Sequence, residues 1–215
     1  MSVLRITGQN IMDIKEKYAI NHGKVSENSV YLNERLFSTY NRISVKRLNK
    51  KLSGKNVDLG SGDKGFSGYL KTINIESFSY DYPSFDIEKD TLEQENNSID
   101  FITMNAVLEH IKNPNNIFKE ISRVLKTDGL IFVRTPNWQM DYKNFYNDPT
   151  HVKPYSPLTL KQTFEFYNLK TVFIEPGLIE KSWFWWSLPN KIKWNIASLI
   201  NGGTKSILGV GLKNE

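Results

Sequence analysis

The sequence predicts an α/β fold built on a mainly parallel sheet with helices on both faces. Short apolar runs typical of strands alternate with segments in which apolar residues recur every three or four positions. A glycine-rich turn follows the first strand-like run, and an acidic residue ends the next one. The chain has 215 residues and no internal repeat, so we expect one domain with a substantial core.

The apolar periodicity places the elements along the chain. Helical patterns cover 29–52, as one helix or two, and then 66–70, 114–125 and 157–167. Strands are predicted at 56–59, 77–82, 85–87, 99–104, 130–133, 170–174 and 207–212. Ligands of such alternating folds bind at the carboxyl ends of the strands.

Composition excludes several kinds of chemistry. The chain has no cysteine, which rules out disulfides, thiolate metal sites and cysteine nucleophiles. The first ten residues lack the apolar run of a secretory signal, and no apolar stretch is long enough to span a membrane, so we expect a cytoplasmic protein. The net charge of +5 is spread along the chain, which favours a solvated surface over a nucleic-acid interface.

The glycine-rich turn has the arrangement of a nucleoside-binding loop. Gly60, Ser61 and Gly62 follow a strand and precede a helix, and Asp81 ends the next strand. Glycine lets the backbone turn tightly or approach a ligand, and a carboxylate at Asp81 can accept hydrogen bonds from both ribose hydroxyls. Similar spacing occurs in dinucleotide-binding proteins, and a turn without any ligand is a further reading. Asp58, two residues before Gly60, disfavours a pyrophosphate and suits a cationic ligand such as S-adenosylmethionine.

Four stretches of the chain resemble the class I methyltransferases, in particular the type 11 family. They are 57–64 (VDLGSGDK), 97–102 (NSIDFI), 105–111 (NAVLEHI) and 121–130 (ISRVLKTDGL). The similarity covers 55–135 closely, weakens toward the C-terminus and does not include 1–30. Two positions depart from the family pattern, because Lys64 stands at the third glycine and Thr127-Asp128 replace proline-glycine before Gly129. Neither change removes an expected cofactor contact.

The resemblance implies an enzyme that uses S-adenosylmethionine. It also implies a Rossmann-like sheet of seven strands in which the last strand is antiparallel. Within one methyltransferase domain, we expect an N-terminal helical cap at 1–53 and a cofactor-binding core at 54–177. An aromatic lid or insertion at 178–205 and the last strand at 206–215 complete this expected organisation.

The same resemblance assigns roles to individual residues by position. The methionine part of the cofactor would be held by Asp58, by the loop of Gly60, Ser61 and Gly62, and by Asn105. The ribose would be bound by Asp81 and the adenine bordered by Asp90 and Thr91. Glu109 and His110 follow Asn105, where capping and packing are as plausible as ligand contact.

His151 is the residue we expect to act as a base on an acceptor hydroxyl. It follows the predicted strand at 130–133, and histidine titrates near neutral pH. The stretch 148–151 (DPTH) is similar to one in methyltransferases of bacterial surface-sugar pathways, and Tyr146 and Tyr155 could stack on a sugar. The alternative is that His151 only fixes a proline-rich loop. No metal site is predicted, since the three histidines are far apart in sequence, although folding could bring them together.

Residues 178–205 contain four of the five tryptophans together with several lysines. Tryptophan favours interfaces, so this segment fits a lid packed on the core, a peripheral contact with the inner face of a membrane, or an oligomer interface. The four tryptophans are Trp183, Trp185, Trp186 and Trp194. A lipid-linked sugar acceptor would suit the first two readings.

The leading functional hypothesis is methyl transfer from S-adenosylmethionine to a hydroxyl of a sugar or polysaccharide precursor. Methylation of a quinone or another small molecule is the alternative within the same class. A nicotinamide-dependent oxidoreductase is the alternative of another class, and the acid at Asp58 argues against it. A non-catalytic domain that binds S-adenosylmethionine is the third. Nucleic acid is not an expected substrate, because no basic stripe is present.

Overall fold

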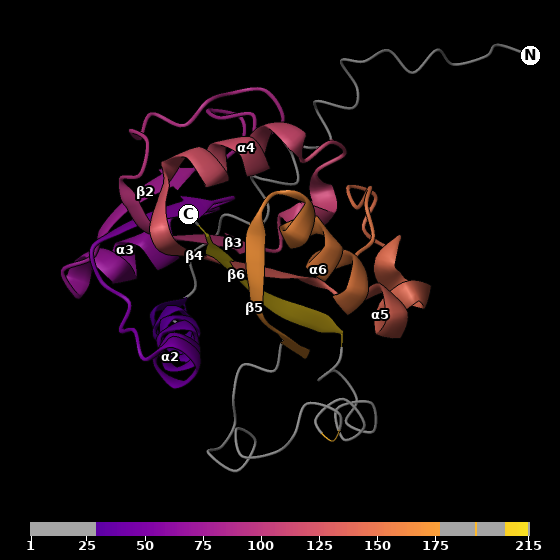
Figure 1. The fold of residues 1–215 in the computed structure, drawn as a ribbon. Helices are drawn as coiled ribbons and strands as arrows, with labels where there is room; N and C mark the ends of the chain where they lie inside the picture. The colour runs from indigo at the N-terminus through magenta and orange to yellow at the C-terminus, as the bar shows by residue number, and fades with distance from the viewer. Residues whose placement is uncertain (1–28, 177–191, 193–204, 215) are drawn as a thin grey trace, which may run out of the picture.

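The computed structural model describes residues 29–176, 192 and 205–214. Their centre is a six-stranded sheet in the order β2-β1-β3-β4-β6-β5. Strands β1, β2, β3 and β4 pair in parallel, whereas β6 is antiparallel to both of its neighbours. Helices lie on both faces of the sheet (Figure 1). The predicted mainly parallel sheet with an antiparallel last strand is therefore confirmed.

The described elements follow the alternation expected of the sequence. The strands are β1 (Lys55–Leu59), β2 (Glu76–Tyr80), β3 (Ile99–Asn105), β4 (Leu125–Pro136), β5 (Leu169–Pro176) and β6 (Ser206–Lys213). The helices are α2 (Ser29–Leu48), α3 (Gly65–Thr72), η1 (Leu108–His110), α4 (Asn115–Val124), α5 (Trp138–Phe145) and α6 (Pro157–Phe166), of which η1 is a single 3₁₀ turn.

Strand β4 shows why the sheet needs a layer of helices on each face. Side chains alternate across a strand, and here both sets are apolar and completely buried. Ile131 and Val133 belong to the core under α4 and α6. Leu130 and Phe132 belong to the core under α2 and α3. A near-continuous apolar run of this kind is the mark of a strand covered on both sides.

Helix α2 carries an aromatic side chain that reaches the end of β3. Tyr40 is fully buried and stacks on Phe132 of β4 with ring centroids 4.6 Å apart. Its hydroxyl donates a hydrogen bond to the side-chain oxygen of Asn105, the last residue of β3. Helix α2 is thus packed against the sheet and also contacts a residue that the sequence assigns to the cofactor site.

The prediction of a strand at 85–87 is wrong. These residues lie in turns between β2 and β3, and the described part of the chain has six strands rather than seven. Phe85 is apolar because its ring packs on Tyr80, with centroids 4.6 Å apart, and not because it enters the sheet. Helix α5 was not predicted. It begins at Trp138, and the side chain of the capping residue Asn137 accepts a hydrogen bond from the Gln139 N–H.

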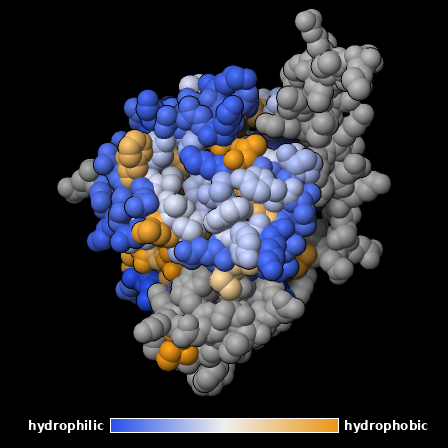
Figure 2. All heavy atoms as spheres, turned by 90° about the vertical axis from the view of Figure 1, so that its right-hand side faces the viewer, coloured by the Kyte–Doolittle hydropathy of each residue, from blue (hydrophilic) through white to orange (hydrophobic). Residues whose placement is uncertain are grey.

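No helix among the described residues is both long and apolar enough to cross a membrane. Figure 2 shows one face of the molecule, on whose coloured part hydrophobic residues form separate spots among hydrophilic ones. The tryptophans at 183–194 lie outside the described residues, so their role as lid, membrane contact or interface stays a prediction.

We expect Phe132→Ala to lower the free energy of unfolding by about 3–5 kcal/mol, because it opens a cavity between Tyr40 and the sheet. Phe166→Ala is the matched control, since Phe166 is 76% exposed, and its effect should stay within about 0.5 kcal/mol. Urea-induced unfolding of the two variants measures the difference. Equal losses in the two variants would contradict the placement of Phe132 in the core.

Candidate functional site

A cavity of about 400 Å³ lies beyond the carboxyl ends of β1, β2 and β3. Its volume is within the range of small-molecule sites. The lining comes from the glycine loop, the segment after β2, the segment after β3 and the loop before α6. The lining residues are Gly60, Gly62, Asp81, Tyr82, Phe85, Asp86, Ile87, Glu88, Ala106, Val107, Glu109, His110, Ile111, Asp148, Thr150 and His151.

The two glycines of the loop are required for different reasons. Both have left-handed backbone angles, with φ of 70° at Gly60 and 52° at Gly62. A β-carbon at Gly60 would lie 2.1 Å from a methyl group of Val107, so only glycine lets this neighbour approach. A β-carbon at Gly62 would meet nothing within 4 Å. Gly62 therefore faces open space at the cavity, where a side chain would stand in the way of a ligand.

Asp58 lies underneath the glycine loop and not in the cavity lining. Its side chain is 3% exposed and accepts hydrogen bonds from Thr103 on β3, at 2.7 Å, and from Ser67 on α3, at 3.4 Å. Burial raises the pKa of Asp58 to about 7, and the two hydroxyls oppose the shift only in part. A negative charge on this carboxyl would lie directly below any ligand of the loop.

Asp81 follows β2 and lines the cavity next to Gly62. The backbone N–H groups of Tyr82 and Gly62 donate to its carboxylate. Partial burial raises the pKa of Asp81 from its ordinary value, while these donors and the nearby Lys64 oppose the rise. The carboxylate is thus fixed beside the glycine loop with an edge toward the cavity, as a ribose-binding acid requires.

The same cavity is also lined by an acid and two histidines. Glu109 is 1% exposed and accepts a hydrogen bond of 2.8 Å from the Thr135 hydroxyl. Burial raises the pKa of Glu109 to about 7. The rings of His110 and His151 lie with their centroids 4.8 Å apart. These three side chains lie within reach of one another and face the same space.

His151 is held by its Nδ1 atom, which lies 2.7 Å from the carbonyl oxygen of Phe145. A carbonyl only accepts, so Nδ1 carries the proton and the lone pair of the neutral ring is on Nε2. Nε2 is 3.7 Å from a carboxylate oxygen of Asp148. This is the tautomer that a base at this position needs.

The loop that carries His151 is attached to the segment after β3 through backbone atoms. The N–H groups of Val152 and Lys153 both donate to the carbonyl oxygen of Glu109, at 2.9 and 3.1 Å. The distance between the histidine loop and the strand-end segment is therefore set by main-chain hydrogen bonds. Side-chain variation in the loop leaves this attachment in place.

Two residues that the sequence assigned to the adenine lie outside the lining. Asp90 and Thr91 are exposed, and the Asp90 carboxylate accepts from the Asp86 N–H at 2.7 Å. The turn that this bond closes directs Asp86 and Ile87 toward the cavity in their place. The sequence analysis did not single out the two other acids of this turn, Asp86 and Glu88, which line the cavity.

Tyr155, which the sequence predicts to bind substrate, does not line the cavity. Its side chain is 1% exposed and belongs to the hydrophobic core, and its backbone carbonyl accepts from the Trp138 N–H at 2.8 Å. The ring of Tyr155 fills the interior beneath α6. Tyr146 is 59% exposed, packs against Trp138 at 5.7 Å between ring centroids, and does not line the cavity.

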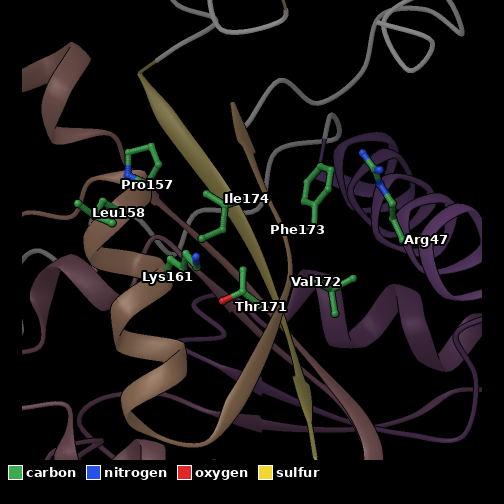
Figure 3. Close-up of a pocket in the computed structure, with 8 residues that line it drawn as sticks. All are labelled: Arg47, Pro157, Leu158, Lys161, Thr171, Val172, Phe173 and Ile174. Carbon is green, nitrogen blue, oxygen red and sulfur yellow. The ribbon is translucent and has the colours of Figure 1, made fainter. Parts of the chain in front are cut away.

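A second cavity, of about 370 Å³, lies along the edge strand β5 (Figure 3). Arg47 from α2 and Lys161 from α6 contribute to it together with residues of β5. Arg47 pairs with the buried Glu175 at 3.0 Å and lies over the ring of Phe173 at 5.4 Å. The lining contains no acid, no histidine and no residue of the larger cavity, so we assign no chemistry to it.

The sequence matches the family model described as a methyltransferase domain over residues 30–173. The chain belongs to the methyltransferase domain family. The matched segment runs from α2 into β5, and therefore includes the whole lining of the acid-rich cavity. The chain is therefore a methyltransferase, an enzyme that transfers a methyl group. Among curated proteins, none matches the sequence.

Solved methyltransferase structures share the fold. A SAM-dependent methyltransferase from Archaeoglobus fulgidus is 22% identical with a TM-score of 0.56, over 84% of this chain and 94% of that one. One from Aquifex aeolicus is 11% identical with a TM-score of 0.58, over 91% and 97%. Phosphoethanolamine N-methyltransferase 2 from Haemonchus contortus, solved with S-adenosyl-L-methionine, is 13% identical with a TM-score of 0.58, over 85% and 53%.

Membership of the methyltransferase domain family supports S-adenosylmethionine as the cofactor.

The buried acid predicts an unusual pH dependence of stability. Because folding raises the pKa of Asp58 from 3.8 to about 7, its proton stabilises the folded state below pH 4, and this contribution is lost as the pH rises through 7. Asp58→Asn removes the titrating group. We expect the stability of the variant relative to wild type to increase from pH 5 to pH 8 in urea-unfolding measurements.

Asp128→Asn is the control for the charge change. Asp128 is exposed and has a φ of 61°, which asparagine tolerates. Its stability should follow wild type across the same pH range. Parallel curves for wild type and Asp58→Asn would show that the Asp58 carboxyl is not buried as described.

Proposed function

We propose that this enzyme transfers the methyl group of S-adenosylmethionine to a hydroxyl of a sugar or polysaccharide precursor. The observation that carries the proposal is one cavity with two different ends. Asp81 and the glycine loop form an end suited to a nucleoside, and His151 with its fixed tautomer forms an end suited to a hydroxyl.

The charge of the lining suits a cationic cofactor without phosphate. Five carboxylates border the cavity, and its described lining contains neither lysine nor arginine. A pyrophosphate would be repelled there, whereas a sulfonium and an ammonium group are attracted. The five are Asp81, Asp86, Glu88, Glu109 and Asp148. This charge pattern also argues against the nicotinamide-dependent alternative.

Each part of the cofactor has candidate partners in the chain. Asp81 would accept hydrogen bonds from the ribose hydroxyls, and Asp86 with Ile87 would border the adenine. The open face of Gly62 would admit the methionine part, with the charge of Asp58 beneath it. Asn105, which ends β3 and is held by Tyr40, would fix the segment leading to Ala106 at the cavity wall. When bound, the cofactor supplies an activated methyl group with a neutral leaving group.

His151 would act on the acceptor. Its Nε2 atom accepts the proton of the hydroxyl while the oxygen forms a bond to the methyl carbon and the carbon–sulfur bond breaks. Asp148, at 3.7 Å from Nε2, would stabilise the resulting imidazolium. Holding the acceptor oxygen in line with the methyl group is the larger part of the task.

The acidic lining favours a polyhydroxylated acceptor over a quinone. Carboxylates only accept hydrogen bonds when ionised, and sugar hydroxyls donate them. Quinone carbonyls accept and would find few donors among acids such as Asp86, Glu88 and Asp148. The stretch from Asp148 to His151, with its similarity to enzymes of surface-sugar pathways, points the same way.

Binding of S-adenosylhomocysteine tests the nucleoside end. Asp81→Asn should weaken binding by about tenfold or more, because a charge-assisted hydrogen bond of about 1.5 kcal/mol or more is lost. Asp128→Asn, at an exposed acid outside the lining, should bind as wild type does. Isothermal titration calorimetry measures both, with NADH as the competing ligand. Binding of NADH alone would overturn the proposal in favour of an oxidoreductase.

Methyl transfer from labelled S-adenosylmethionine to a panel of sugar nucleotides, polysaccharide precursors and quinones tests the acceptor end. With the acceptor found, His151→Gln should lower kcat by about 10²–10⁴-fold while S-adenosylhomocysteine binds unchanged. Tyr146→Phe, at an exposed ring outside the lining, should keep its rate. Cofactor binding without transfer to any acceptor would favour the non-catalytic alternative.

A further inference from the structure

The acceptor end of the cavity also has the composition of a metal site. Glu109 and His110 come from η1 and its edge, and His151 comes from a loop 41 residues later in the sequence. One ligand atom from each of the three lies within 4.8 Å of the other two. Two imidazoles and one carboxylate are the protein ligands of many catalytic zinc sites, which leave a further position open.

Both imidazoles have the tautomer that metal binding through Nε2 requires. For His151, the Phe145 carbonyl fixes the proton on Nδ1. For His110, Nδ1 lies 2.9 Å from the Thr150 hydroxyl oxygen and 3.2 Å from the Thr150 carbonyl oxygen. The Thr150 hydroxyl gives its own proton to Asp148 at 2.6 Å, so both oxygens of Thr150 accept from His110.

This pattern matches the outer shell of protein metal sites. A histidine that binds a metal commonly donates its second ring nitrogen to a backbone carbonyl or a carboxylate, which fixes the orientation of the ring. Here Phe145 and Thr150 supply such acceptors, and Thr150 is in turn held by Asp148. Glu109 has its own partner in the hydroxyl of Thr135 at 2.8 Å. Each of the three side chains is therefore oriented by a defined neighbour.

The backbone keeps the three residues together. The Glu109 carbonyl accepts from the N–H groups of Val152 and Lys153, so the two segments that supply the ligands cannot separate without breaking both bonds. The surrounding acids, including Asp148, add negative potential that attracts a cation. The chain has no cysteine to compete for a borderline metal.

We propose that Glu109, His110 and His151 bind one divalent transition-metal ion of the zinc class, and that the acceptor oxygen completes its coordination. The proposal deepens the proposed function and rests on it for the acceptor. A hydroxyl on the ion loses its proton to solvent more readily, and its oxygen then bonds to the methyl carbon as the carbon–sulfur bond breaks. Without the ion, His151 accepts this proton directly. An acceptor with two adjacent oxygens would bind the ion best.

Calorimetric titration of the chelator-treated full chain with Zn²⁺ tests the site without any acceptor. We expect one ion per chain, and at least about tenfold weaker binding in Glu109→Gln and in His151→Ala. His22→Ala is the matched control, because His22 is the remaining histidine of the chain, and it should bind as wild type does. Visible absorption of the Co²⁺ form should show ligand-field bands in wild type that His151→Ala alters.

Retained binding of S-adenosylhomocysteine by each variant shows that it is folded, so a lost zinc site is not a lost fold. Unchanged zinc affinity in both variants, or no binding by wild type, would overturn the metal site. Cofactor binding and methyl transfer without zinc binding would leave the proposed function standing. Zinc binding without any methyl transfer would support the metal site and count against the proposed function.

Discussion

The carboxyl group of Asp58 joins three elements in the interior of the protein. It belongs to β1, accepts from Thr103 on the neighbouring β3, and accepts from Ser67 on α3. The glycine loop between β1 and α3 is therefore held at both ends by one buried acid. An apolar residue there would pack more easily, and burial instead raises the pKa of Asp58 to about 7. A cationic ligand of the loop would favour the charged form of this carboxyl.

The local parts of the fold and the site could be predicted from the sequence. Strand, glycine loop and helix follow one another between Lys55 and Thr72, and Asp81 lies one strand later. Such signals work because parallel strands end at the same edge of the sheet. The apolar residues at 85–87 misled for a similar reason, because their alternation served a turn packed on Tyr80 and not a strand.

Long-range contacts could not be predicted in the same way. His110 and His151 are 41 positions apart, and only the attachment of Val152 and Lys153 to Glu109 brings their rings together. The aromatic character of Tyr155 suggested a sugar-stacking surface, whereas its ring fills the core. Composition alone cannot separate these two uses of a tyrosine. The net charge of +5 likewise gave no sign of a cavity bordered by acids.

The histidine loop is attached through main-chain atoms, so its position does not depend on the side chains that it carries. The N–H groups of Val152 and Lys153 bond to the carbonyl of Glu109 whatever side chains they carry. The position of the histidine loop relative to the segment after β3 is thus set by main-chain atoms and not by the side chains of the loop. Exposed residues of this loop such as Val152 can therefore be exchanged without loss of the attachment that places His151 beside Glu109.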